Sequence, residues 1–157
     1  MTEIFSGPLT NNDIFLICTY GVIPAWILLA VLPHWSWTNH IVHSIVIPIL
    51  LGVAYTWIFA SGAFSGDDGG GFGSLAQLLI LFTNPSAVLA GWIHYLVFDL
   101  FVGAWEVRDA KRRGLNHLLV LPSLFLTLMA GPMGLLLYLL TRSAFRKGGL
   151  SLKESAT

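Results

Sequence analysis

Four long apolar stretches restrict what this 157-residue chain can fold into. They run approximately over residues 13–32, 40–60, 86–107 and 117–140. A helix of about 20 residues crosses the roughly 30 Å hydrocarbon core of a bilayer. Backbone amides must be hydrogen-bonded internally in lipid, so helices are the expected structure. The sequence therefore predicts an all-α integral membrane protein, with residues 1–157 forming one bundle of four transmembrane helices.

The composition agrees with a membrane protein and argues against nucleic-acid binding. Hydrophobic residues make up 55% of the chain and charged residues 10%, whereas soluble domains carry about 25% charged residues. Every Lys and Arg lies at or after Arg108. Such a distribution suits anionic lipid headgroups better than a phosphate backbone. Cys18 is the one cysteine, so no disulfide forms within the chain, and we interpret it as a small buried hydrophobe.

Local signals mark where the helices begin. Asn84 and Pro85 suit the cap and first position of the third helix, Asn116 suits the cap of the fourth, and residues 11–13 suit the cap of the first. Residues 61–74 are Gly-rich and read as a mobile connector. The apolar segment that follows, residues 74–82, is too short to span. We expect it to form a short interfacial or re-entrant helix before the third span.

The basic residues create a topological conflict. Residues 108–116 and 141–157 each carry four Lys or Arg. Four spans would place these segments on opposite sides, against the positive-inside rule. A reversal at residues 131–134, Gly-Pro-Met-Gly, would remove the conflict but would leave two limbs of about a dozen residues, each too short to cross. We therefore expect four spans and assign no orientation.

The first residues carry no basic segment of the kind that opens a signal peptide, so the first apolar stretch is expected to be retained as a span. The chain also lacks the composition of a transit peptide. We expect an integral protein of the bacterial inner membrane.

The third apolar stretch places ionisable groups in the membrane. At 100° per residue its polar and aromatic residues divide into two nearly opposite faces. One face holds Trp92, Tyr95, Asp99, Val102 and Glu106, and the other holds His94, Phe98, Phe101, Trp105 and Arg108. His94 and Asp99 therefore need partners from other helices.

Asp99 is the most costly of these groups to bury. A carboxylate at the bilayer centre costs about 2.5–3.5 kcal/mol on insertion scales. We expect Asp99 to face the interior of the bundle, where it is hydrogen-bonded, paired or protonated, either as an acid–base group or as a helix–helix lock. Glu106 is expected to act with it, to pair with Arg113, or to contact water. Residues 109–113 are interpreted as a solvated, headgroup-facing cluster.

No motif for a metal or cofactor is evident. His34, His40, His43 and His94 could be imagined as ligands, but no HExxH or Glu-x-x-His pair is present. A histidine at a membrane interface usually only places its polar ring at the boundary with water and has no catalytic role. We expect neither a metal nor a cofactor.

Two long motifs resemble a known family. Gly91–Trp105 reads GWIHYLVFDLFVGAW, and Pro122–Arg142 reads PSLFLTLMAGPMGLLLYLLTR. Both are similar to helices of the ABA4-like family, and a P-x-W-x-L-L…P pattern from Pro24 to Pro33 agrees. The resemblance covers nearly the whole chain and implies a four-helix membrane protein of carotenoid metabolism.

The resemblance also implies a type of chemistry. Plant relatives are needed to make neoxanthin from violaxanthin, an isomerisation in which an epoxide opens as its oxygen gains a proton and a nearby carbon loses one. We expect an isomerase or epoxide-opening enzyme that acts on a membrane-dissolved polyene and retains it, or another lipid, in a groove beside the third helix. The expected acid–base groups are Asp99, His94 and Glu106, and the slot is expected to be lined by Trp92, Tyr95 and Trp105.

Two other functions stay open at this point. The chain is alternatively a non-catalytic carotenoid- or lipid-binding subunit of a pigment complex, since a binding slot and an active site look alike in sequence. It is alternatively a small transporter or proton-relay protein, for which only Asp99 and His94 lie deep enough. The expected partners are membrane lipid, a carotenoid or other long apolar ligand, and a second copy of the chain or a pigment-complex subunit, with no nucleic acid.

Overall fold

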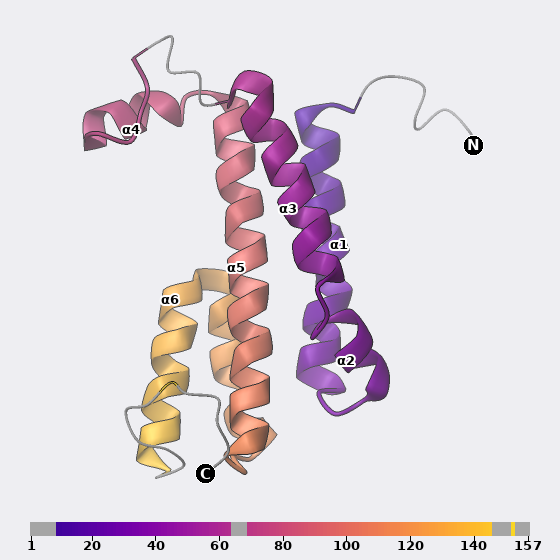
Figure 1. Ribbon diagram of the computed structural model, residues 1–157. Coiled ribbons are helices and arrows are strands. Elements are labelled where there is room, and N and C mark those ends of the chain that lie inside the picture. The colour runs from indigo at the N-terminus through magenta and orange to yellow at the C-terminus, as the bar shows by residue number, and fades with distance from the viewer. Residues whose placement is uncertain (1–8, 64–68, 146–151, 153–157) are drawn as a thin grey trace. The chain divides into compact units, whose positions relative to one another are not determined.

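The computed structural model describes residues 9–63, 69–145 and 152, and every regular element in that part of the chain is a helix. The expected segment 61–74 falls partly outside these residues. The elements are α1 (Asn11–Val31), α2 (Ser36–Ile41), α3 (Val46–Ile58), the π-helical η1 (Phe59–Ala63), α4 (Leu75–Leu81), α5 (Pro85–Arg112), the 3₁₀ turn η2 (His117–Leu119) and α6 (Leu121–Ala144) (Figure 1).

Four helical segments are long and apolar enough to cross a membrane, which confirms the predicted fold class. They are Asn11–Val31, Ser36–Ser61, Pro85–Arg112 and His117–Ala144. At most half of the apolar window in each is buried inside the protein. The remaining apolar side chains face outward, as lipid-facing residues do. The short helix α4 lies where the sequence predicted one, and its interfacial position stays a prediction.

The chain divides into two compact units. Unit 1 consists of Met1–Val22 and Pro48–Val97, and unit 2 consists of Ile23–Ile47 and Phe98–Thr157. The long helices α1 and α5 are each divided between the two units, α1 after Val22 and α5 after Val97. The acidic residues of α5 and the whole of α6 belong to unit 2, so the candidate site is described within that unit.

Polar contacts join the helices of unit 1. The side chain of Asn11 donates a 2.9 Å hydrogen bond to Oγ of Ser86. The backbone N–H of Ser86 donates to the side-chain oxygen of Asn84 at 2.9 Å, which confirms Asn84 as the cap of α5. At the start of α1, Thr10 and Asp13 exchange side-chain and backbone hydrogen bonds. This is a capping box, so the cap of α1 lies one residue before the position expected from the sequence.

The helix α6 of unit 2 is broken in the middle. Ala130 has φ −159° and ψ 63°, which lie outside the helical region. We call residues 121–129 the first limb and residues 131–144 the second limb. The Cα of Gly134 lies so close to the backbone of Thr127 that an added Cβ would overlap the Thr127 backbone nitrogen. Residues seven apart lie about 10 Å apart along a straight helix, so the chain reverses direction between them (Figure 1).

The contacts of the second limb give its direction. A Cβ added to Gly131 would meet Asp99, and the rings of Trp105 and Tyr138 pack edge to face. Arg142 binds Asp109. Along these three contacts the residue numbers of the second limb and of α5 increase in the same direction, so the second limb runs parallel to α5. The first limb starts just after the end of α5 and runs antiparallel to it, so both ends of α6 lie at the Arg112 end of α5.

This geometry differs from the interpretation of residues 117–140 as one continuous span. The sequence favours one span because a limb of about a dozen residues is too short to cross. A hairpin that enters and returns has no need to cross, provided that its non-helical backbone is shielded by protein. Gly131 is buried against α5 in unit 2. Pro132 then falls in the first turn of the second limb, where its missing N–H leaves no acceptor unsatisfied.

Candidate functional site

The two faces predicted for α5 are found in unit 2. Asp99 and Glu106 are buried, with 8% and 0% of their surface exposed. Phe98 and Phe101, from the opposite face, are more than half exposed. The polar face of α5 therefore points into the protein, as the cost of placing carboxylates in lipid requires.

Glu106 is a wholly buried carboxyl group with one oxygen in a hydrogen bond. The hydroxyl of Thr127 in the first limb donates to Oε1 of Glu106 at 3.0 Å. Oε2 of Glu106 has no hydrogen-bond partner among the described residues. Arg113, one of the partners that the sequence suggested, binds Asp109 instead. Glu106 is therefore held in place by one oxygen while the other remains available for a proton.

Asp109 is the centre of a buried ionic cluster. Its Oδ2 accepts a 2.8 Å hydrogen bond from the hydroxyl of Tyr138 and a 3.0 Å hydrogen bond from Nη1 of Arg142. Nε of Arg113 lies 2.8 Å from the same oxygen, and Nη2 of Arg112 lies 3.5 Å from Oδ1. The interpretation of Asp109 as solvated is wrong, since only 1% of its surface is exposed. The physical reason is the second limb, which brings Tyr138 and Arg142 over this part of α5.

Asp99 lies at the start of the second limb. Oδ1 of Asp99 is the nearest atom to the position that a Cβ on Gly131 would occupy. A carboxylate at a helix N-terminus is stabilised by the partial positive charge of the free N–H groups there. This position favours the helix–helix lock over the acid–base role among the two that the sequence left open for Asp99.

Three of the expected site residues belong to unit 1. His94 is exposed, and its ring centroid lies 6.4 Å from that of Tyr55. Nε1 of Trp92 donates a 2.8 Å hydrogen bond to Thr19 of α1, and the Trp92 ring stacks on Tyr95 at 5.3 Å. In that unit these aromatic residues join α5 to α1 and α3. Of the expected slot residues, Trp105 alone belongs to unit 2 with Asp99 and Glu106.

An apolar groove of about 330 Å³ lies in unit 2 between α1 and the first limb. Trp26 and Leu124 form part of its lining. Both side chains lie over Gly103 of α5, where an added Cβ would be 2.7 Å from Cζ3 of Trp26 and 3.4 Å from Cδ2 of Leu124. Gly103 precedes Glu106 by about one helical turn. The groove is at the small end of the range for ligand pockets, about 300–1,000 Å³.

A second apolar groove, of about 560 Å³, lies in unit 1 between α1 and α3. Cys18 and Trp57 are among its lining residues. Cys18 itself is buried, as expected for a small hydrophobe. Among the described residues, no group of three or more His, Cys, Asp and Glu side chains is close enough together to hold a metal ion.

The sequence predicted no site role for Thr127, Tyr138 or Arg142, and it placed Asp109 in a solvated cluster. A signal for Asp109 was available, because Asp109 and Arg113 continue the spacing of three and four residues that joins Asp99 to Glu106. Tyr138 and Arg142 lie on the second limb, and their contact with α5 depends on the reversal at Ala130. No local pattern in the sequence predicts that pairing.

These features define a class, an all-helical protein with helices of membrane-spanning length and a cluster of buried carboxyl groups on one of them. The chain belongs to the ABA4-like family, described as ABA DEFICIENT 4-like, whose model matches residues 13–138. This result confirms the family resemblance seen in the sequence.

One curated relative is the protein ABA DEFICIENT 4, chloroplastic, of Arabidopsis thaliana. It is 25% identical over 138 residues, which cover 84% of this chain and 61% of the relative. The chain thus spans about three fifths of that relative's length. The relative is chloroplastic, which gives no support to the expected bacterial inner membrane. No solved structure matches this chain.

Proposed function

We propose that this protein acts in carotenoid metabolism, as a membrane enzyme that isomerises a polyene by proton transfer at Glu106. The family and its ABA DEFICIENT 4 relative support the pathway. The observation that carries the site is Oε2 of Glu106, a fully buried carboxyl oxygen with no hydrogen-bond partner among the described residues.

Glu106 suits general acid–base catalysis of an apolar substrate. A positioned carboxyl group contributes about 10²–10⁴-fold to a proton transfer. In an epoxide-opening isomerisation, the C–O bond breaks as the oxygen gains a proton, and a neighbouring carbon loses a proton. A carboxyl group that gives the first proton and receives the second ends unchanged, and the formula of the substrate is unchanged too. Thr127 holds Oε1 and so aims the other oxygen.

The groove over Gly103 is the proposed binding place for one end of the polyene. Its lining is apolar, and its lining residue Trp26 covers Gly103, which lies about one turn of α5 from Glu106. Its 330 Å³ suit an end group rather than a whole long ligand. Asp99 has a positioning role in this proposal, at the start of the second limb. His94 is left out of the acid–base pair because it is exposed beside Tyr55.

A second candidate function is a non-catalytic carotenoid-binding subunit. The observation that favours it is the groove itself, whose lining residues are all apolar. In that case the carboxyl groups hold the hairpin in place and take no part in chemistry.

The test is pigment profiling of a carotenoid-producing host with and without this gene, followed by the variant Glu106→Gln. The wild-type protein should convert one xanthophyll into an isomer of the same mass. Glu106→Gln should reduce conversion by about 100-fold or more while the purified protein keeps its bound pigment. Asp13→Asn, the same change of carboxyl to amide at the start of α1, is the matched control and should retain activity.

Each outcome of this experiment decides between the candidates. Retained pigment with no conversion by the wild-type protein would favour the binding subunit. Full conversion by Glu106→Gln would exclude the carboxyl group as the proton donor. A pigment profile that does not respond to the gene would refute the carotenoid role.

A further inference from the structure

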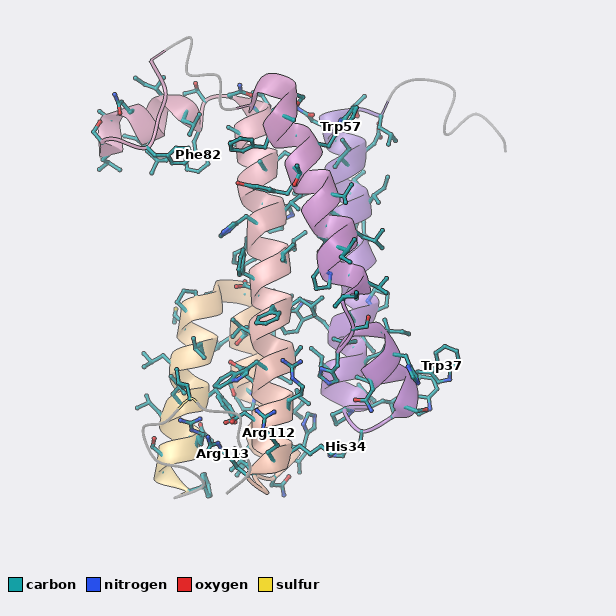
Figure 2. All side chains as sticks on the ribbon, viewed as in Figure 1. His34, Trp37, Trp57, Phe82, Arg112 and Arg113 are labelled. Carbon is teal, nitrogen blue, oxygen red and sulfur yellow. The ribbon has the colours of Figure 1, made fainter. Side chains whose placement is uncertain are left out.

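The hairpin of α6 gathers basic side chains at one end of unit 2. Arg142 from the second limb meets Asp109 of α5 at 3.0 Å, next to the basic residues that end α5. We define the basic end of unit 2 as Arg108, Lys111, Arg112, Arg113 and Arg142. Figure 2 shows Arg112 and Arg113 at this end, together with His34.

Basic residues outnumber acidic residues in the sequence at the end of α5. Residues 106–113 hold two acidic residues, Glu106 and Asp109, and four Lys and Arg, and Arg142 of α6 adds a fifth cation. Asp109 lies within 4 Å of three of these cations. Arg108 lies 3.0 Å from Nδ1 of His43. A guanidinium group has only donors, so that nitrogen of His43 is an acceptor and adds no negative charge.

Exposed apolar residues follow both helices that carry these cations. Lys111 and Arg112 are exposed. Leu118, just after α5, is 69% exposed, and Phe145, just after α6, is 53% exposed. Cationic groups next to exposed apolar side chains at the end of a membrane-length helix are typical of the boundary between hydrocarbon and headgroups.

We propose that the basic end of unit 2 is a binding surface for anionic phospholipid headgroups of one leaflet, with Lys111 and Arg112 in contact with the lipid phosphate. The surface combines an excess of cations with an apolar border, which suits an amphiphile with a negative head. Arg142, which binds Asp109, keeps the end of the second limb in place beside this surface. This proposal is independent of the chemistry proposed for Glu106.

The experiment is a native mass spectrometry titration of the full chain in detergent with phosphatidylglycerol, and in parallel with phosphatidylcholine. The wild-type protein should retain phosphatidylglycerol selectively. The double variant Lys111→Gln/Arg112→Gln should bind it about 30-fold more weakly, since each basic residue near an anionic surface contributes roughly fivefold. The charge-preserving swap Lys111→Arg/Arg112→Lys is the matched control and should bind as the wild-type protein does.

Three results would overturn the proposal. The first is equal retention of the two lipids by the wild-type protein. The second is unchanged phosphatidylglycerol binding by the double variant, with its folding verified by circular dichroism. The third is displacement of phosphatidylglycerol by millimolar inorganic phosphate, which would assign the surface to a soluble anion instead of a lipid.

Discussion

Nη1 of Arg142 donates a 3.0 Å hydrogen bond to Oδ2 of Asp109, and this contact fastens the end of α6 to the end of α5. Both residues are at most 2% exposed. A buried ion pair of this kind is weak evidence for net stability, but loss of one partner leaves the other charge buried and uncompensated. The pair therefore specifies the position of the second limb more than it adds stability.

The first prediction concerns this ion pair. Asp109→Asn should lower the free energy of unfolding by about 3–5 kcal/mol, because Arg142 is left as a buried charge without its counterion. Tyr138→Phe removes one hydrogen bond to the same carboxylate and should cost only about 1 kcal/mol. Unfolding of the purified protein in mixed micelles, followed by circular dichroism, measures both. Equal losses for the two variants would contradict the central place of the charge.

The second prediction concerns the close approach of the two limbs. Gly134→Ala places a Cβ against the backbone of Thr127, so it should force the limbs apart and cost about 1–3 kcal/mol. Gly21→Ala is the matched control because a Cβ there meets nothing within 4 Å. The control should be neutral or stabilise α1, since Ala is a better helix former than Gly. A similar melting temperature for Gly134→Ala and the wild-type protein would mean that the limbs do not pack as described.

The third prediction concerns the groove over Gly103. Gly103→Ala should push Trp26 away from α5, because the added Cβ would lie 2.7 Å from its ring. The side chain would then fill the groove, and the amount of retained polyene should fall about tenfold if displacement costs about 1.4 kcal/mol. The absorbance ratio of pigment to protein measures this. Gly52→Ala in α3, where nothing lies within 4 Å, should leave the ratio unchanged, and an unchanged ratio in Gly103→Ala would place the polyene elsewhere.

The fourth prediction concerns membrane topology. If Asn11–Val31, Ser36–Ser61 and Pro85–Arg112 each cross once and α6 enters and returns, the two ends of α6 share one side. In a Cys18→Ala background, Asn116→Cys and Phe145→Cys should react with an impermeant maleimide from the same side of sealed vesicles. Thr10→Cys should react from the other side. Labelling of Asn116→Cys and Phe145→Cys from opposite sides would show that α6 crosses the membrane.

Much of the fold follows from local patterns in the sequence. The apolar stretches, the Asn84–Pro85 start of α5 and the inward face of α5 with Asp99 and Glu106 were all predictable. Each depends on residues close together in the chain, where helical periodicity and capping apply. The Gly-Pro-Met-Gly segment also suggested a reversal in α6. Limb length alone favours one span, because each limb is too short to cross, but a hairpin whose backbone is shielded by other helices does not need to cross.

The site was less predictable than the fold, because its contacts join residues that are far apart in the sequence. Glu106 was expected as a site residue, but its partner Thr127 comes from the first limb. Asp109 was expected to be solvated because the sequence after it is rich in Lys and Arg. Its burial depends on Tyr138 and Arg142, which reach α5 only after the chain turns back at Ala130. Contacts between distant segments of this kind are set by tertiary packing, which helical periodicity in one segment does not encode.

The break at Ala130 also bears on how such a chain is made. Since both ends of α6 lie at one end of α5, a hairpin that enters and returns would keep Arg142 on the side of the bilayer that holds the basic residues at the end of α5. Each Lys or Arg moved through the bilayer centre would cost about 2.5–3.5 kcal/mol. Insertion of α6 as such a hairpin would therefore move only its apolar limbs into the hydrocarbon and would require no cation to cross it.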